Sequence, residues 1–271
     1  MFAFMKSCPE TIFFDDFTAP YLNRDRWNVE ISGNIHNQEQ QAYVDSAETI
    51  YVSQNEADCE GALVIHARSQ PGFCTQQGDV FDFISGRIHT RGKVAFRYGC
   101  VSARLKMPAF EGLWPAFWAL GISGAWPACG EIDIMEAVGE PDWVSAAVHG
   151  ANFSGEAALV NKKYFRAPHN IDEWHVYAVE CSPTGLSFFV DEELIYRITR
   201  PMVEFFGPWA FDTDKFIILN LALGGTYPFK TNGVRQPYYG LPPHSVQAIQ
   251  ANKARYVVDW VKITTLKRDG E

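Results

Sequence analysis

Short runs in which hydrophobic and polar side chains alternate recur along most of the chain, and glycine, proline, aspartate and asparagine separate them. A period of two residues is typical of strands that bury one face. Ten such runs stand out: LVIHARS, FISGRIHT, VAFRYGCVSARLKM, LWPAFWAL, EIDIMEAV, VSAAVHG, WHVYAVEC, LSFFVDEELIYRI, KFIILNLAL and ARYVVDWVKIT. Turn residues such as those of VDEELI favour antiparallel connections. The pattern therefore predicts an all-β sandwich or barrel.

One segment has helical periodicity instead. The run SVQAIQANKA at 245–254 places Val246 and Ile249 one turn apart, and Ser245 is a residue type that caps helices. The chain shows no internal repeat, low-complexity tract or linker, so residues 1–271 are predicted to form a single domain with long loops at 28–60 and 224–253.

The run GEIDIMEAVGE departs from simple alternation. Glu131 and Asp133 fall on one face of a strand and Met135 should follow them, yet the third acid is Glu136, one residue late. A helix would scatter the three acids around its axis, since each residue turns about 100°. A β-bulge at Ile134–Met135 would absorb the extra residue and turn Glu136 onto the face of the other two acids.

Three acids on one strand face point to catalysis. Like charges this close raise at least one pKa and cost stability, which is typical of functional sites. A solvated strand face is disfavoured by the apolar residues between the acids, and the spacing is not that of a calcium loop. Two carboxyls, one ionised and one protonated, cleave glycosidic bonds; a separation of about 5–5.5 Å implies retention and about 6.5–9.5 Å inversion. Glu131, Asp133 and Glu136 are therefore the predicted catalytic residues.

Several side chains near this strand are candidates for sugar binding. Trp114 and Trp118 share one face of the run GLWPAFWALG, and Trp126 precedes the acid strand. Their rings suit stacking on pyranoses, although core packing is an equally good interpretation for any single tryptophan.

Four polar residues complete the candidate binding set. Arg87 in FISGRIHT is placed on a polar strand face and could donate to hydroxyls or to a carboxylate. His149 lies in a run expected to neighbour the acid strand, although a lone histidine is often structural. Asn37 and Glu39 belong to the polar loop NQEQQAY and either bind sugar hydroxyls or make turns.

Composition narrows the partner. The net charge of −9 over 271 residues argues against a nucleic-acid groove and against an anionic polymer, so a neutral partner fits better. The run lengths exclude a membrane-spanning segment, which needs about 18 apolar residues. Six cysteines do not make a disulfide scaffold at this length, although Cys59 and Cys74 flank one predicted strand and are a possible bridge.

These motifs resemble glycoside hydrolase family 16, particularly its bacterial endo-β-1,3-glucanases, or laminarinases. The likeness is carried by NQEQQAY, SGRIHT, YGCVSARLKMP, GLWPAFWALG, WPACGEIDIMEAVG, VHG, FFVD, ILNLALGG and VDWVKI, and it spans about residues 13–264. It implies a concanavalin-like β-jelly-roll of two curved antiparallel sheets, with a substrate cleft on the concave face. It also implies retaining hydrolysis without a catalytic cofactor.

The resemblance assigns roles that spacing alone leaves open. It makes Glu131 the nucleophile and Glu136 the acid/base, while Asp133 would hydrogen-bond a neighbouring carboxyl. A structural calcium on the convex face would be held by three positions that match the family pattern: Asp16, Gly61 and Asp259.

The expected substrate is a β-1,3-glucan, cut by a secreted or periplasmic monomer whose leader is not in this sequence. Alternatives are a mixed-linkage β-1,3-1,4-glucanase, another β-glycan hydrolase of the family, and a non-catalytic glucan-binding lectin. The chain departs from the pattern at Tyr227, where laminarinases commonly have tryptophan, and in the long segment that follows it.

Overall fold

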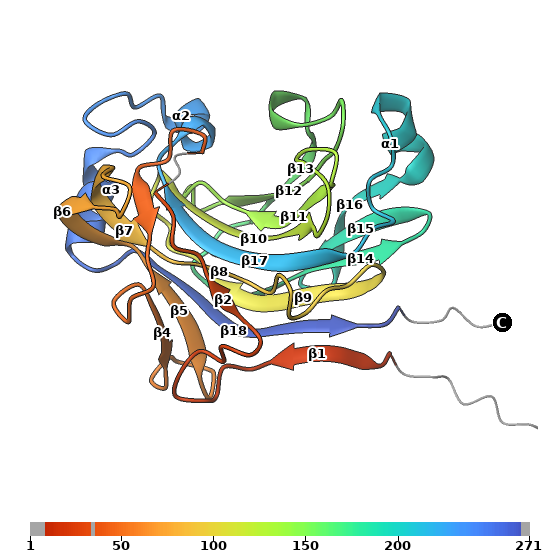
Figure 1. Ribbon diagram of the computed structural model, residues 1–271, viewed down its shortest axis with the longest axis horizontal. Coiled ribbons are helices and arrows are strands. Elements are labelled where there is room, and N and C mark those ends of the chain that lie inside the picture. The colour runs from red at the N-terminus through yellow and green to blue at the C-terminus, as the bar shows by residue number, and fades with distance from the viewer. Residues whose placement is uncertain (1–8, 34–35, 267–271) are drawn as a thin grey trace, which may run out of the picture.

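The structure is a computed structural model that describes residues 9–33 and 36–266. Within these residues, two large sheets lie face to face. In Figure 1 the seven-stranded sheet curves upward above the eight-stranded one. In spatial order its strands are β13 (Leu159–Tyr164), β12 (Trp143–His149), β11 (Glu131–Glu136), β10 (Leu113–Gly121), β17 (Lys215–Leu223), β8 (Arg87–His89) and β2 (Asn28–Val29).

The second sheet closes the core from below. It runs in the order β16 (Glu193–Thr199), β15 (Gly185–Val190), β14 (His175–Ser182), β9 (Gly99–Lys106), β18 (Arg255–Thr264), β5 (Ala62–His66) and β4 (Ile50–Ser53), with β1 (Thr11–Asp15) paired to β18. A small third sheet contains β3 (Gln41–Tyr43), β7 (Val80–Ser85) and β6 (Arg68–Cys74). The strand pairs are antiparallel apart from β3 and β7, which run parallel.

The alternation in the sequence explains how the sheets pack. In β9, for example, Val101, Ala103 and Leu105 are buried while the residues between them are half-buried. Side chains of this kind from both large sheets join one hydrophobic cluster, and burying them stabilises the sandwich. The predicted all-β sandwich of two curved antiparallel sheets is confirmed.

The helices are short: η1 (Gly155–Ala157), α1 (Arg200–Phe206), α2 (Thr226–Asn232) and α3 (Pro243–Gln250). None in the described ranges is long and apolar enough to cross a membrane. The helix predicted at 245–254 begins earlier and ends earlier, and Pro242 rather than Ser245 is its N-cap. A proline at the first helical position favours this start, and the Ser245 hydroxyl instead donates to the Glu111 carbonyl at 2.6 Å.

Two other expectations were wrong. The segments predicted as long loops contain ordered elements that were not expected, namely β2, β3 and β4 in the first and α2 in the second. Cys59 and Cys74 carry free thiols, so the suggested bridge between them does not form.

The turn that follows the acid strand depends on Gly139. Its φ of 89° lies in the left-handed region, and a Cβ at this position would come within 1.8 Å of the Phe110 carbonyl oxygen. Only glycine satisfies both constraints.

We expect Gly139→Ala to lower the free energy of unfolding by about 3 kcal/mol, because it combines left-handed strain with a backbone clash. Gly92→Ala is the matched control: Gly92 also has positive φ, at 76°, but has open space around it. This control should lose only about 1 kcal/mol. Urea unfolding of both variants measures the difference, and equal losses would contradict the proposed clash.

Candidate active site

A bulge in β11 shifts the phase of the acids. Opposite β10, Glu136 pairs with Ala116 and Met135 with Phe117, but the next residue of β10, Trp118, already pairs with Asp133. The ladder therefore skips Ile134, and the same irregularity appears against β12. This confirms the bulge predicted from the spacing.

The bulge separates acidic from apolar side chains. Ile132, Ile134 and Met135 are buried in the core between the sheets. Glu131, Asp133 and Glu136 instead line a cleft of about 370 Å³. The apolar residues thus fix the strand from behind while the carboxyls face the cleft.

The cleft gathers most of the predicted binding residues from distant parts of the sequence. Its lining includes Asn37, Glu39, Arg87, Trp114, Trp118 and Trp126. Among the predicted binding residues, His149 is the one that is not part of this lining. Their contacts with substrate remain a prediction.

Indole N–H groups hold the two outer acids. Trp126 Nε1 donates to Glu131 Oε2 at 2.6 Å, and Trp114 Nε1 donates to Glu136 Oε1 at 2.9 Å. These two tryptophans were expected as stacking platforms, and the structure gives them a second task. Each donor stabilises the ionised form of its acid and fixes its orientation.

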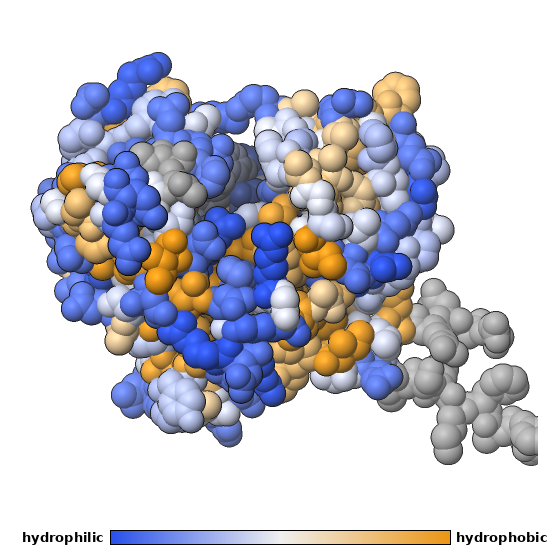
Figure 2. All heavy atoms as spheres, in the orientation of Figure 1, coloured by the Kyte–Doolittle hydropathy of each residue, from blue (hydrophilic) through white to orange (hydrophobic). Residues whose placement is uncertain are grey.

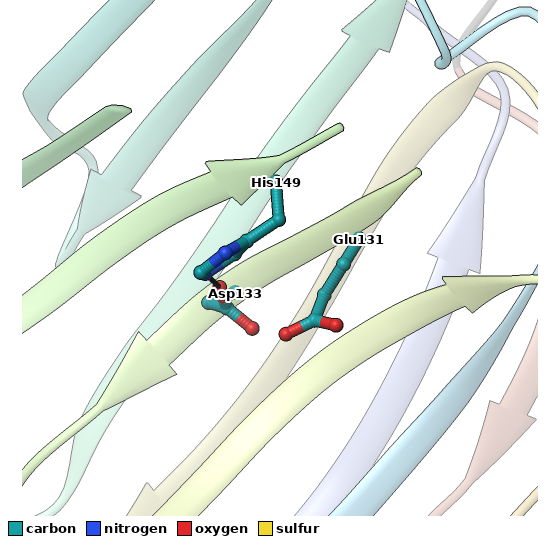
Figure 3. Close-up of side chains that lie close together, drawn as sticks. All are labelled: Glu131, Asp133 and His149. Atoms are coloured by element: carbon teal, nitrogen blue, oxygen red, sulfur yellow. Dashed lines mark ion pairs between the residues drawn. The ribbon is translucent and has the colours of Figure 1, made fainter. Parts of the chain in front are cut away.

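His149 stands beside the central acid. Figure 3 shows Glu131 and Asp133 on β11 and His149 on the neighbouring strand pointing toward one another. Nε2 of His149 lies 3.0 Å from Asp133 Oδ2, within ion-pair range. Its Nδ1 accepts the backbone N–H of Gly155 at 3.2 Å, so the proton of a neutral ring is on Nε2, facing the aspartate.

Burial raises the proton affinity of all three acids. It raises the pKa of Glu131 to about 8, with the charge of Asp133 as the next cause. It raises the pKa of Glu136 to about 7, and it raises the pKa of Asp133, to which the charge of Glu136 adds. Glu131 and Asp133 also share a hydrogen bond, which needs a proton because two carboxylates have no donor. Near neutral pH the group therefore keeps at least one proton.

A polar network on the other side of the cleft was not predicted. Trp118 Nε1 donates to Asn220 Oδ1 at 2.7 Å, and Asn220 Nδ2 donates to the Tyr43 hydroxyl at 3.1 Å. Both partners line the cleft together with Arg87, whose guanidinium lies 5.0 Å from the Trp118 ring. Burial raises the pKa of Glu39 in the same region. The signal for Asn220 was a single amide inside the apolar run FIILNLAL.

Three side chains of the site lie close enough together to be considered as metal ligands. One ligand atom each from Glu131, Asp133 and His149 lies within 4.8 Å of the others. The imidazole nitrogen that faces this point carries the ring proton, however, because the other nitrogen accepts from Gly155. A metal ligand needs that lone pair free, so this set suits proton sharing better than a cation.

The positions named for calcium fit only in part. A Cβ on Gly61 would lie 2.4 Å from the Phe17 carbonyl, so Gly61 is pressed against the residue after Asp16. Carboxylate and backbone carbonyl oxygens, which these three positions could offer, are ligands that calcium prefers. Asp259, however, is engaged by the Arg104 guanidinium at 2.5 Å, and Asp16 accepts from Thr18. Calcium binding there remains a prediction.

Comparisons with known proteins agree with this geometry. The sequence profile of glycosyl hydrolases family 16 matches residues 33–227. A beta-glucanase of Rhodothermus marinus is 32% identical over 267 residues, covering 94% of this chain and 84% of that protein. A beta-1,3-glucan-binding protein of Penaeus monodon is 29% identical, covering 88% of this chain and 80% of that protein. The X-ray structure of an endo-beta-1,3-glucanase from Pyrococcus furiosus superposes with a TM-score of 0.82 at 32% identity, covering 95% and 94%.

The raised pKa of Glu131 predicts a pH-dependent cost to stability. An acid whose pKa rises on folding binds more protons when folded, so stability falls as pH rises from about 4.5 to about 8. Glu131→Gln cannot ionise and avoids this loss. We expect its free energy of unfolding to exceed the wild-type value by a margin that grows through this window to about 2 kcal/mol or more.

Urea unfolding at several pH values measures this margin. Glu180→Gln, on β14 of the other sheet, controls for the loss of one acid elsewhere. A margin that stays constant with pH would contradict the assignment.

Proposed function

The chain belongs to glycosyl hydrolase family 16, and from this premise we propose that it is an endo-β-1,3-glucanase that cleaves laminarin-type glucan with retention of configuration. The observation that carries the proposal is the placement of three carboxyls on one face of β11, with an indole donor on each outer acid. A retaining enzyme needs one acid as a nucleophile and one as a proton donor.

In the proposed first step, Glu131 attacks the anomeric carbon as a carboxylate. The bond to the leaving sugar breaks, and Glu136 gives its proton to the leaving oxygen. The raised pKa of Glu136 supports this, since burial keeps the acid protonated up to about pH 7. The proton shared between Glu131 and Asp133 moves to Asp133, which frees the nucleophile.

In the second step, Glu136 removes a proton from water, and the water oxygen attacks the anomeric carbon. The ester to Glu131 breaks and the original configuration returns. Trp126 supports both steps because its N–H holds the Glu131 carboxylate in place. All proton transfers use side chains of this chain, so the mechanism needs no catalytic cofactor.

A neutral glucan fits the lining of the cleft. Trp114, Trp118 and Trp126 offer aromatic rings to it, and Arg87 is the only lysine or arginine among the described lining residues. The Pyrococcus relative, an endo-beta-1,3-glucanase, supports the β-1,3 linkage, and the Rhodothermus beta-glucanase supports a β-glucan substrate. Because such polymers lie outside cells, we also infer a secreted or periplasmic location.

A second candidate is glucan binding without cleavage, which the Penaeus relative favours. A pure binder has no need for a proton-retaining acid cluster, so hydrolysis is the better conclusion. Mixed-linkage β-1,3-1,4-glucan is the alternative substrate within the enzyme reading.

We expect the wild-type protein to release reducing ends from laminarin faster than from lichenan, xyloglucan, agarose or carrageenan. Glu131→Gln should lower kcat on laminarin about 10³-fold or more, because the nucleophile is lost. Glu180→Gln should retain wild-type turnover. Wild-type binding of laminarin without any reducing ends would favour the lectin alternative instead.

Retention has its own measurement. Proton NMR during the first minutes of laminarin hydrolysis should show β-anomeric reducing ends before mutarotation produces the α form. Early α-anomer would show inversion, and Glu131 would then be a base rather than a nucleophile.

A further inference from the structure

Two loops rise from opposite ends of the acid strand. Helix α2 stands at the Glu136 end: its Tyr227 hydroxyl lies 3.0 Å from Ser145 Oγ, and Ser145 pairs with Glu136 in the sheet. The Tyr227 ring also contacts Trp114, with centroids 5.4 Å apart. Tyr227 thus anchors α2 above that end of β11.

The short helix η1 stands at the other end. The backbone N–H of Gly155, its first residue, bonds to His149, and His149 pairs with Glu131 in the sheet. The next residue, Glu156, forms an ion pair with Lys230 of α2. This ion pair therefore connects the two elements that stand at opposite ends of β11.

The figures agree with this arrangement. In Figure 1, α2 belongs to the left-hand group of loops, and the connection between β12 and β13 rises to its right. Figure 2 shows a hollow between these two groups, with hydrophilic residues spanning the gap above it.

We propose that the Lys230–Glu156 ion pair roofs the acid cleft and sets the chain-length preference of the glucanase. This inference rests on the proposed function. In the proposed binding mode the glucan lies across the strands of the concave sheet. Part of the polysaccharide must then pass beneath the ion pair. A short oligosaccharide can thread beneath the closed ion pair from either end of the cleft. An internal segment of a long polymer has no free end nearby, so it binds in the cleft only when the ion pair opens.

The pair is weak enough to open. Its side chains are 42% and 77% exposed, and exposed ion pairs favour the closed arrangement by no more than about fivefold. Both residues are charged while the preferred glucan is neutral, so salt acts on the roof rather than on the substrate. Raising the ionic strength from about 0.01 M to about 1 M shortens the Debye length from about 30 Å to about 3 Å.

The test compares kcat/KM for polymeric laminarin with kcat/KM for laminarihexaose. We expect Lys230→Met and Glu156→Gln each to raise this ratio about two- to fivefold. The exchange of charges in the double variant Glu156→Lys, Lys230→Glu should bring the ratio back toward the wild-type value. High salt should raise the ratio for the wild-type protein and leave it unchanged for Lys230→Met.

Glu193→Gln is the matched control. It breaks another ion pair, between half-buried Lys163 and exposed Glu193, which joins β13 to β16 rather than spanning the cleft. An unchanged ratio in both single variants, or an equal rise in Glu193→Gln, would overturn the role of the roof.

A carbodiimide measurement tests the contact itself and needs no activity. The reagent joins a carboxylate and an ammonium group in contact, with loss of water, and peptide mapping should find Glu156 linked to Lys230. Absence of this link would overturn the roof. A wild-type protein that cleaves no β-glucan would instead overturn the proposed function, so the two failures are distinguishable.

Discussion

The burial of three carboxyl groups on one face of β11 is the constraint around which the site is built. Each acid loses hydration, and Glu131 and Asp133 lie close enough to share a proton. In an isolated strand an acid could turn to solvent, which would restore its hydration and separate it from the other acids. Here the strand is held from behind by Ile132, Ile134 and Met135, so the acids stay together and their proton affinities rise instead.

The sandwich supplies what the acids lack. The donors that stabilise Glu131 and Glu136 come from Trp126, before β11, and from Trp114 on β10. The neighbouring strand β12 brings His149 to Asp133. Trp114 and His149 lie on strands of the sandwich, so the packing that forms the core also fixes these two partners, whereas Trp126 reaches Glu131 from an exposed turn.

The sequence alone was enough to place the acids, because a carboxylate that arrives one residue late has few explanations in an alternating strand. It also separated the two faces of β10, where Trp118 points to the cleft and Phe117 is buried. It offered only a weak signal for Asn220, one amide in an apolar run. Because every residue of β17 is buried, the run does not alternate and does not show which side chains face the cleft. The Lys230–Glu156 contact joins two loops far apart in the chain, and neither loop has a pattern that names the other.

The bulge at Ile134 has a consequence for how such a protein diverges. Adding or deleting one residue in β11 would rotate an acid into the interior, so this strand tolerates substitution far better than changes of length. The loops that carry η1 and α2 have no such restriction, since they begin after the ladder ends. New specificities should therefore arise by insertion and deletion at the rims of the cleft, while the chemistry beneath them is inherited unchanged.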